Sequence, residues 1–425
     1  MSWYKKALPR FAGVFYRGNL PPRPGELKDI TRHGIRIVSK ETLPDTHWAF
    51  KVEHAEWGPA TIMAPRDLQP PPPEMLGYCA RGFTESEMVL ARAAGAGLAV
   101  RLESTRDNVL RDCKNMLRYV DVLMREDGLL ATDFASELLW SRSMLEDELA
   151  HDADVDISAL HVIHAVGDDE RRTWLHTHGL GHVGGLDFDI VAPGDAIASA
   201  SGIDPLRALA FASVEGDLKP GAVVKTLGFP VKLVDAATFQ RKAPREYAAL
   251  REDDEAHTPN RVVLCEPSSG FLGLGSRVQP SKRLSGDDLE GGLIWFSDGA
   301  TELMERRARA TYPLLRKIAA DLAEFEFPTI VKLGYEVDGS SGREHLWFSV
   351  HGLDDDAIDA TLENSPFNIA RLKMGDRGRH PVERLSDWMI MTPAGSITPH
   401  HVSPHRLIND RRDELRKLMR EARGA

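Results

Sequence analysis

The sequence predicts an α+β protein, in which a mixed-sheet N-terminal and central region with packed helices precedes a small β-rich, barrel-like C-terminal domain. Short apolar runs, several alternating with polar residues, recur along the chain and predict strands. Stretches with apolar residues at i, i+3, i+4 and i+7 lie between them and predict helices. After residue 330 the strand-like segments are short and are separated by turns that contain Gly and Asp, which is typical of a small barrel or half-barrel.

The composition indicates a globular protein with more than one domain. The chain has 425 residues, of which 42% are hydrophobic and 28% are charged. Domains usually contain about 100–200 residues, so this length suggests two or three of them. The formal net charge of -11 argues against a general nucleic-acid-binding function, because such binding relies on clustered Lys and Arg.

The sequence also predicts a cytoplasmic location without membrane attachment. No apolar run reaches the roughly 18 residues of a transmembrane helix. No apolar segment follows Lys5 and Lys6, so we expect no signal peptide. The three cysteines, Cys79, Cys113 and Cys265, do not form a disulfide framework, and we expect Cys113 and Cys265 to be buried thiols.

We divide the chain into four predicted modules. Residues 1–68 form a small β-rich N-terminal module, and the proline run at 70–73 is typical of a stiff linker. Residues 74–200 and 201–330 are α+β modules, and the sequence does not decide whether they are two domains or one. Residues 331–425 form a β-rich domain that ends in a charged helix.

The predicted elements follow in order. Thr84 begins a capping box for a helix at 85–94, and the clearest amphipathic stripe predicts a helix at 105–125. A long helix at 301–325 contains Pro313, where we expect a kink. The predicted strands are 36–39, 47–52, 60–63, 98–102, 159–166, 173–176, 222–227, 231–234, 262–265, 293–296, 344–350, 357–363 and 388–391, and further helices are expected at 141–149 and 407–422.

The strongest chemical signal is a histidine-rich segment at 174–180, with the sequence Trp-Leu-His-Thr-His-Gly-Leu. His176 and His178 are two residues apart, so on a strand their imidazoles share one face, about 6–7 Å apart at Cα. With Asp189 they form the ligand set of a catalytic zinc site, in which water takes the fourth position. A metal held there would activate this water for hydrolysis.

The alternative interpretation is structural, and we favour it. His176 and His178 would bond to backbone carbonyls at the end of a strand, the nearby glycines would build the turn, and the chain would need no cofactor. His161 and His164 are three residues apart and therefore point to opposite faces of the preceding strand. One of them could face the side of His176, and the sequence does not decide which.

The same segment resembles the metal site of MPN/JAMM-type metallopeptidases, in which a strand that starts with Trp ends in His-Ser/Thr-His and an Asp follows. Asp189 lies at about the matching distance. Gly179 stands where that family has Pro, and Leu186 where it has Ser. No upstream Glu can be assigned, although Glu146 and Glu148 precede the motif. The resemblance implies a metal-dependent hydrolase of peptide or amide bonds.

Other polar clusters are weaker. Asp152, Asp154 and Asp156 lack the Gly and Glu that an EF-hand needs, so we expect a solvated acidic loop. The glycine run at 270–275 lacks the pattern of a dinucleotide site. Three histidines occur at 400–405. We expect an ordinary polar segment there, and a metal site is the alternative.

The last module contains three aromatic residues, Trp347, Trp388 and Phe367, that could form a binding face. The alternative is that they are core residues, as aromatic positions of small β-modules usually are. Basic residues cluster at 371–379, but the acidic run at 354–356 opposes a nucleic-acid-binding face.

A family resemblance covers this module. Its motifs are Arg-Glu-His-Leu-Trp-Phe-Ser-Val at 343–350, Thr-Leu-Glu-Asn-Ser-Pro at 361–366, Leu-Lys-Met-Gly-Asp at 372–376 and Ser-Asp-Trp at 386–388. In this order they resemble the YegJ-like bacterial domain of unknown function, over about residues 330–395. The segment at 174–180 resembles the partner domain, also of unknown function, that is often fused ahead of it.

The resemblance implies a bacterial cytoplasmic protein and brings no activity, cofactor or catalytic residue. The small domain also occurs attached to ankyrin repeats, which implies a recognition or regulatory role. The sequence therefore predicts a protein that binds or regulates a protein partner, with no nucleic acid and no membrane. The alternative is a metal-dependent hydrolase that uses His176, His178 and Asp189. The sequence decides neither whether the chain is an enzyme nor its oligomeric state.

Overall fold

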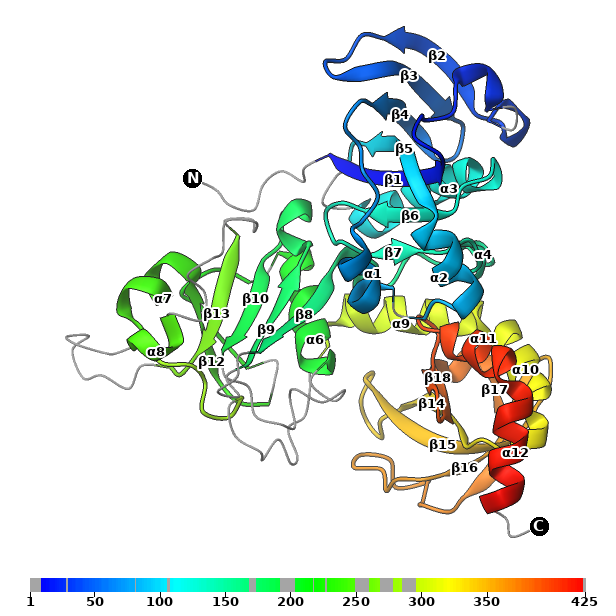
Figure 1. The fold of residues 1–425 in the computed structure, drawn as a ribbon. Helices are drawn as coiled ribbons and strands as arrows, with labels where there is room; N and C mark the ends of the chain where they lie inside the picture. Colours follow the sequence, from blue (N-terminus) through cyan, green and yellow to red (C-terminus); the bar gives the residue numbers. More distant parts are fainter. Residues whose placement is uncertain are drawn as a thin grey trace. The chain divides into compact units, whose positions relative to one another are not determined.

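A computed structural model describes residues 9–27, 30–80, 82–104, 108–167, 173–191, 203–216, 218–225, 228–248, 260–267, 278–284 and 296–422 (Figure 1). The chain forms two compact units. Unit 1 comprises residues 1–72, 94–140 and 155–297, and unit 2 comprises residues 73–93, 141–154 and 298–425. Helices and antiparallel-rich sheets occur in both units, so the predicted α+β class is confirmed.

The two units do not follow the four predicted modules. Residues 73–93 and 141–154 lie within the predicted second module, yet both belong to unit 2. Within the described ranges, no helix is long and apolar enough to cross a membrane.

The first sheet of unit 1 has the N-terminal strand near its middle. β1 (Arg10–Arg17) pairs antiparallel with β5 (Ala94–Leu102) on one side and with β6 (Leu130–Asp133) on the other. Residues from the first two predicted modules therefore share one sheet. Its order is β2-β3-β4-β5-β1-β6-β7, with β2 at Arg36–Glu41, β3 at Thr46–His54, β4 at Gly58–Pro65 and β7 at Leu139–Trp140.

Helix α3 (Val109–Arg125) packs against this sheet, as its apolar stripe predicts. Its residues Cys113, Met116, Leu117 and Val120 are buried. The start of the predicted helix, at 105–107, lies outside the described residues.

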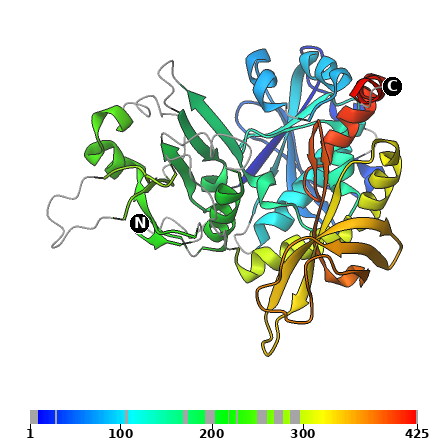
Figure 2. The same ribbon diagram turned by 90° about the horizontal axis from the view of Figure 1, so that it is seen from below.

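The second sheet of unit 1, drawn in green in Figures 1 and 2, carries the histidine-rich segment. Its order is β11-β12-β13-β10-β9-β8, and only the β10–β13 pair is parallel among the pairs described. The strands are β8 (Val162–Gly167), β9 (Thr173–His178), β10 (Asp187–Val191), β11 (Val223–Val224), β12 (Val231–Asp235) and β13 (Arg261–Cys265).

Helices of unit 1 cover this second sheet. α6 (Ile203–Glu215) contacts β10, and the Ser213 hydroxyl bonds to the backbone of Leu186. α7 (Ala236–Lys242) packs on a face of β12 and β13, and the short helix α8 (Arg245–Ala248) follows it. An apolar cluster on this face contains Trp174, Val191, Val234, Phe239, Val263 and Cys265. The predicted glycine run at 270–275 and most of the predicted strand at 293–296 lie outside the described residues.

Unit 2 contains an open six-stranded antiparallel sheet of order β17-β16-β15-β14-β18-β19. The strands are β14 (Thr329–Glu336), β15 (Arg343–Leu353), β16 (Ala357–Leu362), β17 (Arg377–Pro381), β18 (Leu385–Thr392) and β19 (Gly395–Ile397). The β-rich character of this region is confirmed. The expected barrel is wrong, because β17 and β19 are opposite edges of the sheet and do not pair.

Helices supply the second layer that a closed barrel would have supplied. The apolar face of the sheet, with Leu333, Phe348 and Trp388, shares one core with Leu315 and Ile318 of α10. The helices of this part are α9 (Asp298–Ala310), α10 (Tyr312–Asp321), α11 (Ser403–Asp410) and α12 (Arg412–Ala422). A sheet with one apolar face can bury that face against helices without closing on itself.

The long helix predicted at 301–325 is two helices. α9 ends before Thr311, and Pro313 is in the first turn of α10, where a missing backbone N–H costs nothing. The Thr311 hydroxyl donates to the carbonyl of Arg307 and accepts from Nε1 of Trp388 at 3.0 Å. Thr311, at the break between α9 and α10, therefore binds the buried indole of Trp388 on β18.

Three short helices come from earlier in the chain and belong to unit 2. They are α1 (Pro73–Cys79), α2 (Glu85–Arg92) and α4 (Arg142–Leu149). The capping box predicted at Thr84 is confirmed, because its hydroxyl accepts from the backbone N–H of Glu87 and the Glu87 carboxylate accepts from the Thr84 N–H. Ser143 of α4 donates to the same carboxylate, which joins α2 to α4.

Candidate functional site

Three strands bring the histidine-rich segment together with other polar residues. In the register of the sheet, His176 of β9 lies opposite His164 of β8 and opposite Asp189 of β10. Side chains of directly opposed residues point to the same face, so His164 is the histidine that faces the side of His176. His178 shares this face because it is two residues further along β9.

Asp189 is occupied by two donors. Its carboxylate accepts from Nη2 of Arg261 at 2.6 Å and from Nε1 of Trp174 at 3.2 Å. Both partners of the ion pair are buried, and the Arg261 guanidinium lies over the Trp174 ring, 5.1 Å from its centroid. A carboxylate held by a buried guanidinium has its charge balanced already, so this arrangement ties β9, β10 and β13 together.

A carboxylate that the sequence did not indicate, that of Glu137, lies beside His164 and His178. Glu137 Oε2 lies 3.1 Å from Nε2 of His164, and Oε1 lies 3.7 Å from Nε2 of His178. The Glu137 side chain is 37% exposed and that of His164 is 19% exposed, so the group reaches solvent. We call Glu137, His164, His176 and His178 the histidine cluster.

A strained turn presents Glu137. Its φ of 58° is in the left-handed region, which is unfavourable for a residue with a side chain. The turn is fixed by Asp133, whose carboxylate accepts from the N–H groups of Ala135 and Ser136 and pairs with the buried Arg10. Residues held in such conformations persist only where the surroundings over-determine them.

Gly179 makes the approach of the two segments possible. Its φ of 126° favours glycine, and a Cβ there would overlap the carbonyl oxygen of Leu160 and lie 2.9 Å from Cα of Ser136. The turn that follows His178 is thus in backbone contact with the turn that carries Glu137. This close packing explains why glycine stands at position 179, where the metallopeptidase family has Pro.

Aromatic rings line the rest of the histidine cluster. The His176 ring stacks on Trp174 at a centroid distance of 4.1 Å and lies 5.1 Å from the ring of His164. The ring of His182 lies 6.4 Å from that of His178. Burial lowers the pKa of His182, which favours its neutral form.

The predicted metal ligands can now be compared with their surroundings. His176 and Asp189 are opposite each other, but Asp189 already binds Arg261. Across the ranges that the structure describes, no three His, Cys, Asp or Glu side chains are arranged to hold a metal ion. Of the upstream carboxylates, Glu148 pairs with Arg307 in unit 2.

Two buried groups beside the histidine cluster are structural. His161 donates from Nδ1 to the carbonyl of Ile157, and burial lowers its pKa to about 4. Asp187 accepts from the N–H groups of Leu180 and Gly181 and from the Thr177 hydroxyl. Burial raises the pKa of Asp187 to about 6 although these donors oppose the shift.

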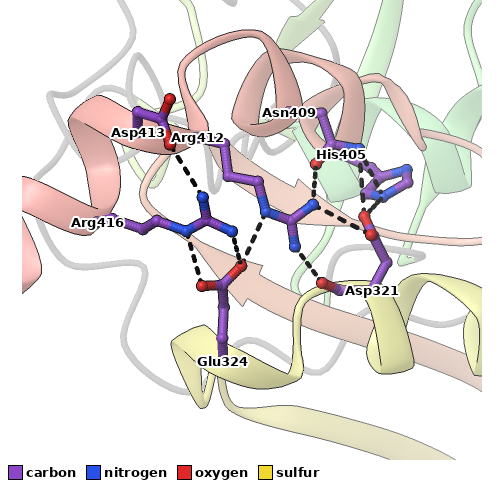
Figure 3. A network of polar contacts seen from close by, with 7 residues as sticks. All are labelled: Asp321, Glu324, His405, Asn409, Arg412, Asp413 and Arg416. Carbon is purple, nitrogen blue, oxygen red and sulfur yellow. Dashed lines mark hydrogen bonds and ion pairs between the residues drawn. The ribbon is translucent and has the colours of Figure 1, made fainter.

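Two of the weaker predicted clusters also have structural roles. The acidic segment at 152–156 is not a solvated loop throughout, because Asp156 is buried, caps a short helix through the N–H of Ser158 and pairs with Arg207. Among the histidines at 400–405, His405 of α11 binds Asp321 of α10 in a network of polar contacts that also includes residues of α12 (Figure 3).

The predicted binding face in unit 2 does not form as one surface. Trp388 is in the core, and Trp347 is on the other face of the sheet, where Lys332 lies over its ring. The register explains the separation, since Trp388 is opposite Val331 whereas Trp347 is opposite Lys332. Phe367 is outside both strands, and it is 86% exposed.

Phe367 belongs to a loop between β16 and β17, residues 363–375, that we call the Phe367 loop. Leu362 closes its ends by backbone bonds to Asp376 and Gly375, both at 2.9 Å. Inside the loop, Ile369 is buried in the core of unit 2. Compact loops of this length with closed ends are frequently functional.

The Phe367 loop is also fastened to the neighbouring hairpin. The Glu344 carboxylate accepts from the N–H groups of Phe367 and Asn368 at 2.7 and 2.9 Å. Asp338 accepts from the N–H of Ala370. The backbone under Phe367 is therefore fixed while its ring faces water.

The fold of unit 2 and this loop define an α+β domain with an open sheet and one projecting aromatic residue. Residues 307–414 match a family described as uncharacterized protein conserved in bacteria (DUF2314), which confirms a bacterial domain of unknown function in the C-terminal region. The match covers about a quarter of the chain. No curated protein and no solved structure matches the chain.

Proposed function

We propose that this chain is a binding or regulatory protein of the bacterial cytoplasm whose DUF2314 domain recognises a protein partner through Phe367. The observation that carries the proposal is the combination of a ring that is 86% exposed with a backbone held by Glu344. Of the three residues of the predicted binding face, only Phe367 is kept in this proposal. Trp388 is in the core and Trp347 is half-buried.

Energetics supports this role for Phe367. Burial of a large apolar side chain in a partner contributes about 1.5–3 kcal/mol. Binding energy in interfaces is concentrated in a few residues, and aromatic residues on rigid elements lose little conformational freedom when they bind. Met374 of the same loop is 64% exposed and is a second large apolar side chain that the loop offers to solvent.

Site-specific crosslinking tests the proposal. Phe367 is replaced in the full chain by p-benzoylphenylalanine, a photoreactive residue of similar shape, and irradiation in cells of the source bacterium should give one discrete protein adduct. Val89, which is exposed on α2 of the same unit, receives the same residue as the matched control and should not give that adduct.

The adduct must also depend on the loop. A Phe367→Asp variant should lose co-purification of the crosslinked protein, and Val89→Asp should retain it. The absence of a discrete adduct at 367, or the same adduct from both positions, would refute the proposal.

A second proposal is a metal-dependent hydrolase of peptide or amide bonds at His176, His178 and Asp189. The observation in its favour is that His164, His176 and His178 share one face beside a carboxylate that reaches solvent, that of Glu137. It is the weaker proposal, because Asp189 is occupied by Arg261. Purified chain would contain zinc in a one-to-one ratio and His178→Ala would lose it, whereas metal-free wild type excludes the site.

A further inference from the structure

The terminal helix α12 has few apolar contacts with the rest of unit 2 and several ion pairs with it. Residues 412–421 are the part of α12 whose burial the structure describes, and none of them is buried. Leu415 and Met419 are its contacts with the core of unit 2, and both are only partly buried. Leu418, between them in the sequence, is exposed.

Two carboxylates provide the polar attachment: Asp321 is the last residue of α10, and Glu324 lies in the short 3-10 helix Ala323–Phe325 that follows it (Figure 3). Glu324 accepts from Nε of Arg412 at 2.9 Å and from Nε and Nη2 of Arg416 at 2.8 and 2.9 Å. Asp321 accepts from Nη1 of Arg412 at 3.1 Å and from His405 of α11 at 2.6 Å. We call these five residues the α12 clasp.

The Glu324–Arg416 pair of the α12 clasp is open to solvent and therefore sensitive to ions, whereas Arg412 is only 23% exposed. The side chains of Glu324 and Arg416 are each 39% exposed. Bonds from Arg416 and Arg412 lower the pKa of Glu324 to about 2, so its carboxylate is charged at neutral pH. Interactions between exposed charges are screened by salt, with a Debye length of about 8 Å at physiological ionic strength and about 3 Å at 1 M.

Apolar packing does not compensate for a weakened clasp. An isolated helix as short as α12 is marginal in water and needs its contacts to stay folded. By contrast α10 has Tyr312, Leu315 and Ile318 in the core, so its stability does not depend on exposed charges.

We propose that α12 is a releasable strap, held closed by the α12 clasp, whose release uncovers the apolar surface of unit 2 beneath Leu415 and Met419. Phe325, over which the Arg412 guanidinium lies at 5.6 Å, is at this surface. Release exposes a second apolar surface in unit 2, and its control by ions is independent of the Phe367 loop.

Hydrogen exchange of the full chain, read by mass spectrometry, tests the strap. When salt rises from about 0.05 M to about 0.5 M, exchange in peptides of 411–422 should accelerate roughly three-fold or more while peptides of α10 stay unchanged. Glu324→Gln should give the same acceleration at low salt and remove most of the further effect of salt.

The matched control is Asp359→Asn, which removes another solvent-accessible carboxylate, 31% exposed, that binds an arginine, Arg377, through two bonds. It should leave exchange of α12 unchanged. Equal exchange rates in α12 and α10, no response of α12 to salt, or an equal effect of Glu324→Gln and Asp359→Asn would overturn the proposal.

A thiol placed under the strap gives a second readout. In Met419→Cys, alkylation of the new thiol should accelerate with salt and with Glu324→Gln, measured against the parent chain with its native cysteines. Alkylation at the rate of an exposed thiol under low salt would show that α12 is not closed, and this result would also reject the strap.

Discussion

Arg307 and Glu148 form a buried ion pair with two bonds, Nη1 to Oε1 at 3.0 Å and Nη2 to Oε2 at 2.5 Å, although they are far apart in the sequence. Arg307 also donates to the carbonyls of Asp154 and Pro399. One side chain of α9 therefore joins the segment at 141–154 to the segment that precedes α11. A few buried polar contacts of this kind build unit 2 from three separate parts of the chain.

The first prediction concerns this pair. Glu148→Gln leaves a buried guanidinium without its counter-charge and should destabilise unit 2 by about 3 kcal/mol. The control is Glu146→Gln on the exposed side of the same helix, which should change stability by less than about 0.5 kcal/mol. Pulse proteolysis in urea, followed through peptides of unit 2, measures both. Equal stability of the two variants would show that the pair contributes nothing.

A second prediction concerns the indole of Trp388. Thr311→Val removes the hydroxyl that accepts from Trp388 Nε1 and should cost about 1–3 kcal/mol, because a buried donor is left without an acceptor. Thr311→Ser keeps the hydroxyl and should cost less. Urea unfolding of both variants decides the point, and a Val variant as stable as the Ser variant would contradict the assignment.

A third prediction is a pH dependence caused by His161. Burial lowers the pKa of His161 to about 4, whereas an unfolded histidine titrates near 6.5. The unfolded state therefore binds the proton first, and the stability that the neutral ring contributes is present above pH 6.5 and is lost as pH falls toward 4. The loss approaches about 3 kcal/mol at the acidic end.

Unfolding of unit 1 measured between pH 7 and pH 4.5 would show this slope. In His161→Gln the slope should be reduced, since the titrating group is gone. His47→Gln, at an exposed position of the same unit, should leave it unchanged. A slope that survives in His161→Gln would assign the acid sensitivity to other groups.

The fourth prediction separates strain from crowding at Gly179. Gly179→Ala places a methyl group against the backbone of Ser136 and Leu160, so the turn must shift away from Glu137. Gly221 also has a positive φ, of 88°, but no atom lies within 4 Å of the Cβ that Gly221→Ala would add. We expect a loss of about 1 kcal/mol at Gly221 and a clearly larger loss at Gly179. Equal melting temperatures for the two variants would rule out the proposed backbone contact.

The fifth prediction distinguishes binding from folding in the Phe367 loop. Phe367→Ser should change the free energy of unfolding by less than about 0.5 kcal/mol, because the ring is exposed. Ile369→Ala, two residues away and buried, should cost about 2–5 kcal/mol. If Phe367→Ser destabilised unit 2 as much as Ile369→Ala, the ring would have a structural role and would not be available to a partner.

Local signals in the sequence were reliable where they depended on neighbouring residues. The stripe of α3, the capping box at Thr84 and the buried thiols of Cys113 and Cys265 are all present. The placement of His176 and His178 on one face of a strand is confirmed as well, because a strand alternates its side chains whatever its partners are.

The surroundings of the histidine cluster were not predictable in this way. Glu137 is separated from His178 by about forty residues and reaches it only because β6 and β7 form a turn that Asp133 and Arg10 fix. Asp189 matches the spacing of a metal ligand, but its partner Arg261 comes from a parallel strand that no local pattern places beside it. The exposure of Phe367 and the burial of Trp388 likewise depend on the register of the sheet.

The sequence by itself determined the α+β class, most local elements and the strand that carries the histidines, because alternation, helical stripes and caps are short-range properties of the backbone. Only the tertiary structure decided which distant residues meet: an open sheet in place of a barrel, a second unit assembled from three segments, Glu137 beside the histidines and α12 held by the α12 clasp. These outcomes depend on which apolar faces and buried charges pair across the folded chain, and the spacing of neighbouring residues does not encode that choice.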